Sequence, residues 1–175
     1  MNNSQNKSTR LSVITALFAA MIFIVTAYLF HIPTPATGGY IHLGDAFVYL
    51  AASMLPTPFA IAAAGIGEAL SDALTGSIVY ALPTLLIKSA MVVCFSSLGK
   101  KIITKRNIAA TVLAGIICIV GYYFTAVILY HNFISPLVDI PANLIQASAS
   151  AVIYVLIGNA FDRLNIRNRI STFTN

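Results

Sequence analysis

Apolar residues run in long blocks along this chain, and short polar stretches separate the blocks. Crossing the roughly 30 Å of hydrocarbon in a bilayer takes about 20 helical residues. Three blocks have that length, at about 11–31, 108–130 and 140–161. Between the first two, prolines and glycines divide an apolar stretch into segments at about 45–55, 58–75 and 82–98. The pattern predicts an all-α integral membrane protein, a bundle of about six transmembrane helices in one domain, residues 1–175.

Charged residues are few and unevenly placed. They make up 9% of the 175 residues, against 58% hydrophobic residues, whereas a soluble domain carries about 25%. The basic residues precede the first predicted helix, fill the loop between the fourth and fifth, and follow the sixth. Basic loops are retained in the cytoplasm, so we expect both termini on the cytoplasmic side. The net charge of +5 then faces membrane lipid, and no nucleic-acid partner is expected.

Several ionisable residues lie within or at the ends of the predicted helices. A charge at mid-bilayer costs about 3 kcal/mol on insertion scales and normally faces a bundle interior or a cavity. Glu68 and Asp72 share one helix face, and Lys88 lies at a similar depth on the next helix. Lys88 either pairs with one of these two acids or lines a ligand cavity. Asp45 and Asp139 are interpreted as N-caps of the second and sixth helices.

A polar stripe follows the outer half of the sixth predicted helix. It contains Asn143, Gln146 and Ser150, at spacings of three and four residues. Tyr123 and Tyr28 lie at the same depth on the fifth and first helices. Aromatic rings beside amides suit a flat, heteroaromatic ligand that forms hydrogen bonds. Hydrogen bonding between helices is the alternative for the amides, and an interfacial belt is the alternative for the tyrosines.

Enzymatic and metal-binding motifs are absent from the sequence. There is no HExxH, Walker loop or CxxC. The three histidines fall in outer loops or at helix ends, with spacings that match no standard metal site. We therefore expect no enzyme activity, no cofactor and no metal.

Three motifs in order resemble those of a known family. The first is Gly39-Tyr40-Ile-His42-Leu-Gly44-Asp45, the second runs from Gly65 to Gly76, and the third is Pro83-Thr-Leu-Leu-Ile-Lys88. Together they resemble the substrate-binding S components of energy-coupling factor (ECF) transporters, in the riboflavin-type and hydroxymethylpyrimidine-type group. The likeness covers nearly the whole chain, including its length, span count and orientation.

The resemblance implies a multi-pass protein of a prokaryotic plasma membrane that captures a vitamin or its precursor from outside. The first outer loop, with Gly39, Tyr40, His42, Gly44 and Asp45, would cover the pocket, and the acidic motif of Glu68 and Asp72 would lie nearby. The candidate ligand contacts are Lys88, Tyr123, Asn143, Gln146, Tyr28 and His42. Because the chain has no tryptophan, hydroxymethylpyrimidine or pyridoxine is favoured over riboflavin.

The resemblance also implies partners. A transmembrane coupling protein and two ATPase subunits would drive transport, and the small residues Ala16 and Ala20 on the first helix would contact the coupling protein. Two other classes are distinguishable by experiment. A self-sufficient proton-coupled transporter would use Glu68, Asp72 and Lys88 as a relay, and a membrane enzyme would use the external histidines and acids, including His42.

Overall fold

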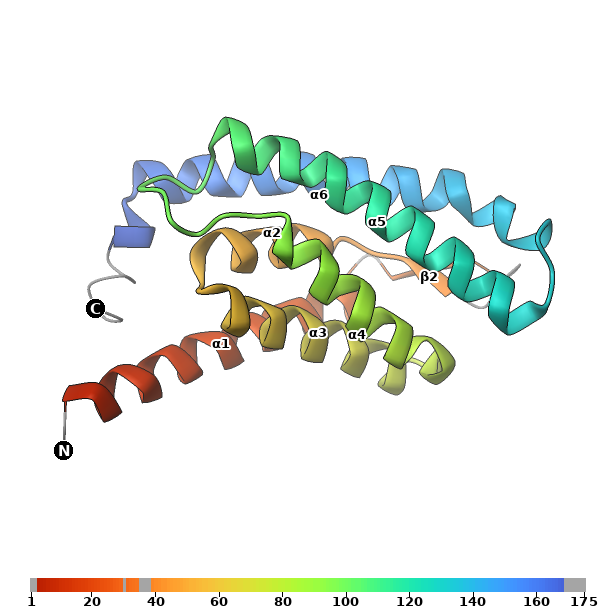
Figure 1. Cartoon of the computed structure of the whole chain (residues 1–175), viewed down its shortest axis with the longest axis horizontal. Coiled ribbons are helices and arrows are strands. Elements are labelled where there is room, and N and C mark those ends of the chain that lie inside the picture. The colour runs from red at the N-terminus through yellow and green to blue at the C-terminus, as the bar shows by residue number, and fades with distance from the viewer. Residues whose placement is uncertain (1–2, 30, 35–38, 169–175) are drawn as a thin grey trace.

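The computed structural model describes residues 3–29, 31–34 and 39–168. Within them the chain is almost entirely helical, with one short β-hairpin between the first two helices (Figure 1). The elements are α1 (Asn3–Tyr28), β1 (Ile32–Thr34), β2 (Gly39–Ile41), α2 (Asp45–Met54), α3 (Thr57–Leu74), α4 (Ile78–Val93), α5 (Lys105–Tyr130), the 3-10 helix η1 (Ser135–Val138) and α6 (Asp139–Arg163). The predicted all-α class is confirmed, and the hairpin adds to it.

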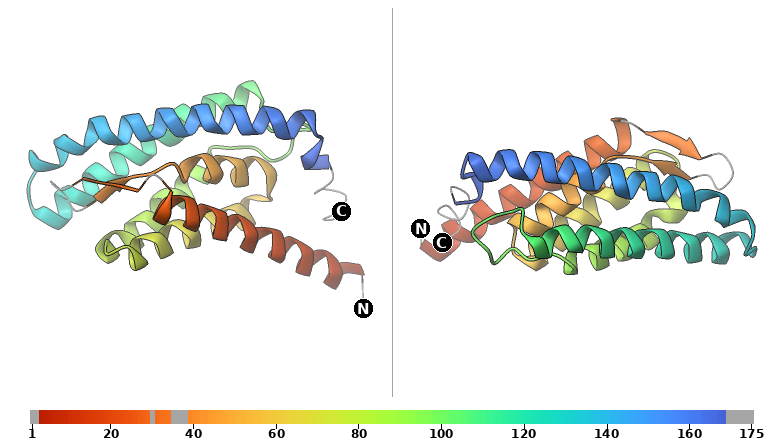
Figure 2. Two further views of the ribbon diagram at one scale, coloured as in Figure 1. Left: turned by 180° about the vertical axis from the view of Figure 1, so that it is seen from behind. Right: turned by 90° about the horizontal axis from the view of Figure 1, so that it is seen from above.

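The helices form two groups that meet directly where α4 packs against α5, with α2 between α3 and α6. In Figure 1, α5 and α6 run side by side along the length of the molecule, while α1, α3 and α4 lie together on the other side of α2. The start of α1 and the end of α6 lie at the same end, as both views in Figure 2 also show. The hairpin lies toward the opposite end. Beside the hairpin, residues of α3, α4, α5 and α6 come together around one pocket.

Among the residues that the structure describes, three helical segments are long and apolar enough to cross a membrane. They are Lys7–Tyr28, Lys105–Tyr130 and Ser135–Arg163, whereas Asp45–Met54 and Ile78–Val93 are apolar but shorter. Large apolar side chains cover the outer faces of the long helices, for example Val112 and Leu156, each 66% exposed. Such a surface is typical of a protein whose surrounding solvent is lipid.

Prolines and a buried amide set the ends of the shorter helices. Leu55 is extended because it precedes Pro56, so α2 ends at Met54. The fourth helix begins at Ile78 rather than near residue 82, since Pro83 is accommodated inside it with the loss of one backbone hydrogen bond. It ends at Val93 rather than near residue 98, because the Asn107 side chain binds both the N–H and the C=O of Ser96, each at 3.0 Å.

The first and third helices approach closely at Gly67. A Cβ atom there would lie 2.7 Å from the backbone oxygen of Ala19, so only glycine fits. Ala16 and Ala20 lie on a different face of α1 and are exposed. This part of α1 therefore presents small side chains away from the rest of the bundle.

Candidate functional site

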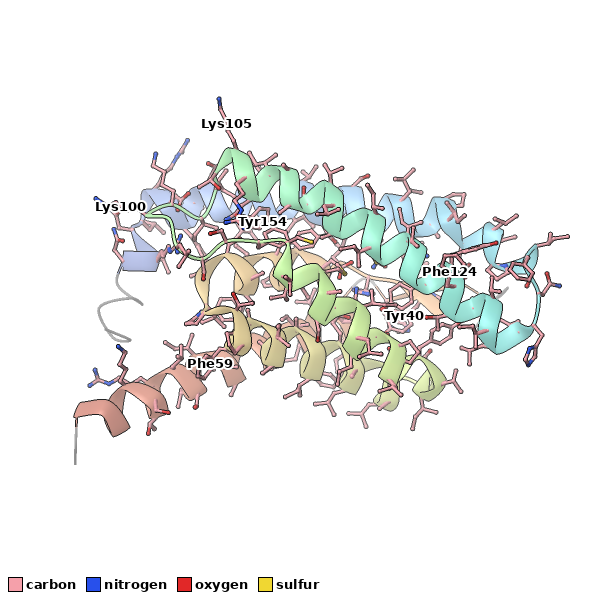
Figure 3. All side chains as sticks on the ribbon, in the orientation of Figure 1. Tyr40, Phe59, Lys100, Lys105, Phe124 and Tyr154 are labelled. Carbon is pink, nitrogen blue, oxygen red and sulfur yellow. The ribbon has the colours of Figure 1, made fainter. Side chains whose placement is uncertain are left out.

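A pocket opens where the hairpin meets α3, α4, α5 and the start of α6. It holds about 630 Å³ of space, including its opening to solvent. Its polar and aromatic lining residues are Tyr40, His42, Asp72, Ser77, Tyr80, Tyr122, Tyr123, Asp139, Asn143 and Gln146. Tyr40, labelled in Figure 3, lies in the half of the molecule away from the two termini. Aromatic walls with a few polar groups are the usual lining of a small-molecule site.

Tyr40 fastens the hairpin to α3. Its hydroxyl donates a hydrogen bond to Asp72 Oδ1 at 2.7 Å and lies 3.1 Å from Ser71 Oγ. The ring stacks on His31, with centroids 3.9 Å apart. Burial, followed by the nearby Asp72 carboxylate, raises the pKa of Tyr40 well above its usual value. The hydroxyl therefore keeps its proton and remains the donor to Asp72.

Gln146 fastens the same segment to α6. Its Oε1 accepts the backbone N–H of His42 at 3.1 Å, and its Nε2 donates to Asp45 Oδ2 at 2.8 Å. Flipping the amide would place two acceptors against each other at Asp45 and two donors against each other at His42. The orientation of this pocket-lining amide is therefore fixed by its two partners.

His42 is buried in its neutral form. The backbone N–H of Gly44 donates to Nδ1 at 3.1 Å, so the ring proton belongs on Nε2, which faces Glu68 Oε2 at 3.6 Å. Burial and the nearby Lys88 charge lower the pKa of His42 to about 3. His42 thus forms part of the wall that supports Gln146 and carries no charge at neutral pH.

Lys88 forms an ion pair with Asp45. This pairing differs from the expected partners of Lys88, and Asp45 does not have the expected role of a helix N-cap. The Lys88 ammonium group donates to Asp45 Oδ1, and both side chains are 0% exposed. Asp45 and Asp139 are the first residues of α2 and α6, and no side chain caps either helix. Lys88 was expected to meet Glu68 or Asp72, yet Asp45 reaches it because the segment after the hairpin enters the bundle. Lys88 does not line the pocket: it lies 5.4 Å from the ring centroid of Tyr122, which does.

The remaining expected ligand contacts divide into two sets. Tyr123, Asn143, Gln146 and His42 all line the pocket. Tyr28 does not, because its side chain is 68% exposed and packs edge-on against Phe23. The N-terminal part of α6 therefore lines the pocket, as the polar stripe indicates, whereas Tyr28 at the end of α1 does not.

Several pocket residues were not expected from the sequence. Tyr80 and Tyr122 complete the aromatic lining, and Asp139 and Ser77 add polar groups. Tyr122 directly precedes the expected Tyr123, but the apolar run around both gives no sign of which face of α5 is buried. Tyr80 lies between the segments predicted at about 58–75 and 82–98, outside both of them.

The carboxylates and the imidazole beside the pocket are close enough together to hold a cation in principle. Ligand atoms of His42, Asp45 and Glu68 all lie within 4.8 Å of one another, and the three residues are buried. However, Asp45 is already engaged by Lys88 and Gln146, and His42 Nδ1 by Gly44. An ammonium group thus already occupies the place beside Asp45 where a cation would bind.

Comparison with known proteins identifies the class. Residues 6–163 match the family described as "ECF-type riboflavin transporter, S component". The match covers most of the chain, which belongs to this family. It is therefore a transmembrane S component of a vitamin uptake transporter and not an enzyme. A curated relative, described as an uncharacterized protein in gap 3'region of Pyrococcus woesei, is 36% identical over 107 residues, 61% of this chain and 72% of the relative.

Proposed function

We propose that this S component captures a small heteroaromatic vitamin or vitamin precursor from outside the cell in the pocket beside the hairpin. The observation that carries the proposal is the combination of four tyrosines, Asp72 and an oriented Gln146 around one cavity. Rings stack on such walls, and the polar groups select the hydrogen-bonding edge of the ligand. The hairpin, held by Tyr40 and the backbone of His42, serves as the lid.

The choice among vitamins follows from the same lining. The lack of tryptophan placed hydroxymethylpyrimidine and pyridoxine ahead of riboflavin. The four pocket tyrosines supply stacking surface, so the lack of tryptophan is no longer a reason to rank riboflavin behind the smaller compounds. The family description also names riboflavin. We therefore propose all three compounds as the first ligands to test.

The proposed topology is six spans with both termini in the cytoplasm, in the plasma membrane of a prokaryote. Lys100 and Lys105 lie at the end of the molecule where α1 begins (Figure 3). Grouping of basic residues at one end is what the positive-inside rule requires, and it leaves the pocket outside. In this arrangement α2, with 10 residues, crosses only part of the bilayer among its neighbours. Reporter fusions after Gly99 and after Arg163 should both report a cytoplasmic location.

The proposed partners are a transmembrane coupling protein and two ATPase subunits. The exposed face of α1 that carries Ala16 and Ala20 would allow another helix to approach closely. Replacing both alanines with leucine should therefore weaken assembly with the coupling protein while ligand binding persists.

Titration of the purified full chain with riboflavin, pyridoxine and hydroxymethylpyrimidine tests the capture step. We expect at least one compound to bind with a dissociation constant below about 1 μM. Reconstitution in liposomes tests the coupling step, since uptake should require the ATPase module and ATP. Uptake by the chain alone, driven by a pH gradient, would contradict the proposal and favour the proton-coupled carrier that uses Glu68, Asp72 and Lys88.

A further inference from the structure

The charges around the pocket have one sign. Asp72 and Asp139 line it, and no lysine or arginine does so among the residues that the structure describes. His42, the lining side chain that could carry a positive charge, is kept neutral by its burial and by the nearby Lys88 charge. The nearby cation Lys88 is fully buried and paired with Asp45. A bound molecule therefore meets the Asp72 carboxylate in a lining whose described residues include no lysine or arginine.

One of these carboxylates has an unused acceptor. Asp72 is only 4% exposed, and its Oδ1 accepts the Tyr40 hydroxyl. Its Oδ2 is buried and accepts no well-aligned hydrogen bond within residues 3–29, 31–34 and 39–168. The Thr84 hydroxyl lies near this carboxylate but is engaged by the Tyr122 hydroxyl at 2.9 Å. A buried acceptor without a partner costs free energy, so most such groups in proteins are satisfied. Because Asp72 lines the pocket, the ligand is the partner that can satisfy it.

The contact between Tyr40 and Asp72 determines which ligand groups Asp72 Oδ2 can bind. Tyr40 has a single hydroxyl proton, and the 2.7 Å contact commits it to Asp72 Oδ1. The lid thus holds the carboxylate in place and leaves Oδ2 for the ligand. A ligand that approaches with an N–H or O–H group gains a charge-assisted hydrogen bond. A ligand that approaches with a phosphate or carboxylate group brings a like charge to a carboxylate that is only 4% exposed.

We infer that the pocket takes an uncharged or cationic heteroaromatic compound that donates a hydrogen bond to Asp72 Oδ2, and that it rejects phosphorylated and carboxylated relatives of that compound. This inference rests on the proposed function and specifies its substrate class. It means that the unphosphorylated form of a vitamin is captured, while the phosphorylated coenzyme form is left outside.

Matched pairs that differ by one phosphate test this inference. The full chain in detergent micelles is titrated with riboflavin and riboflavin 5′-phosphate, with pyridoxine and its 5′-phosphate, and with hydroxymethylpyrimidine and its phosphate. For the pair whose unphosphorylated member binds, we expect the phosphate to weaken binding roughly 100-fold. Equal affinity within about threefold for both members would overturn the inference while leaving the proposed function in place. Failure of all six compounds to bind folded protein would instead overturn the proposed function.

Two variants locate the effect. Asp72→Asn keeps the size of the side chain and an oxygen for Tyr40, but replaces the free acceptor with a donor. We expect it to weaken binding of the unphosphorylated ligand at least about tenfold. It should also reduce, by about tenfold, the phosphate penalty, which is the factor by which the phosphate weakens binding. Asp139→Asn removes the other lining charge, so it should reduce only the phosphate penalty. If Asp72→Asn melts like the wild type and changes neither affinity, the role given to Asp72 Oδ2 is wrong.

Discussion

The buried ion pair between Lys88 and Asp45 makes the sharpest prediction about stability. Both side chains are 0% exposed, and without the ammonium group the Asp45 carboxylate keeps Gln146 Nε2, at 2.8 Å, as its close donor. Breaking a buried pair by removing one partner costs about 3–5 kcal/mol, because the other charge stays buried without compensation. Lys88→Met, which keeps the length and apolar stem of the side chain, should therefore lower the free energy of unfolding by about that amount.

A double-mutant cycle separates this effect from lost packing. Adding Asp45→Asn to Lys88→Met removes the unpaired charge and keeps an acceptor for Gln146, so we expect at least about 2 kcal/mol to be recovered. Lys100→Met, at an exposed lysine, is the matched control and should change stability by less than about 0.5 kcal/mol. Unfolding in mixed micelles at increasing denaturing detergent gives the free energies. A loss below about 1 kcal/mol for Lys88→Met, or a double variant no more stable than the single one, would refute this reasoning.

Three further predictions concern the hairpin and the segment that joins it to α2. Gly44→Ala would place a Cβ 1.8 Å from Thr26 Oγ1, so it should lower the melting temperature by several degrees, and Thr26→Ala should restore part of the loss. Tyr40→Phe removes the hydrogen bond to Asp72, and stopped-flow measurements should show ligand release about tenfold faster. Because the pKa of His42 falls to about 3 and that of an unfolded histidine is about 6.5, the unfolded state binds an extra proton between these values. Melting temperature should therefore fall as pH decreases below about 6.5, and His42→Gln should reduce this dependence.

Hydrophobic patterning predicts the helices of this chain better than it predicts their partners. Long apolar runs mark α1, α5 and α6, and the Pro56 region marks the break between α2 and α3, because these signals are local. The partner of Lys88 depends instead on where the hairpin places Asp45, which is a tertiary property. A helix such as α5 is apolar on all sides, so its sequence does not show that Tyr122 faces the interior.

The polar stripe on α6 was informative for a physical reason. Polar side chains are rare in a membrane bundle and are retained where they have partners, so Asn143 and Gln146 indicate a face directed away from lipid. Both line the pocket. Tyr28 was misplaced because an interfacial tyrosine and a pocket tyrosine have the same sequence signature at the end of a helix.

Native mass spectrometry of the full chain released from detergent tests the central claim most directly. The wild-type protein, incubated with riboflavin, pyridoxine and hydroxymethylpyrimidine together, should retain one molecule of one compound per chain. Gln146→Leu, which removes the oriented amide but keeps the volume of the side chain, should retain much less, while the exposed-face variant Val112→Leu should match the wild type. A folded wild-type protein that retains none of the three, or a Gln146→Leu variant that binds as well as the wild type, would contradict the assignment of this pocket as the vitamin site.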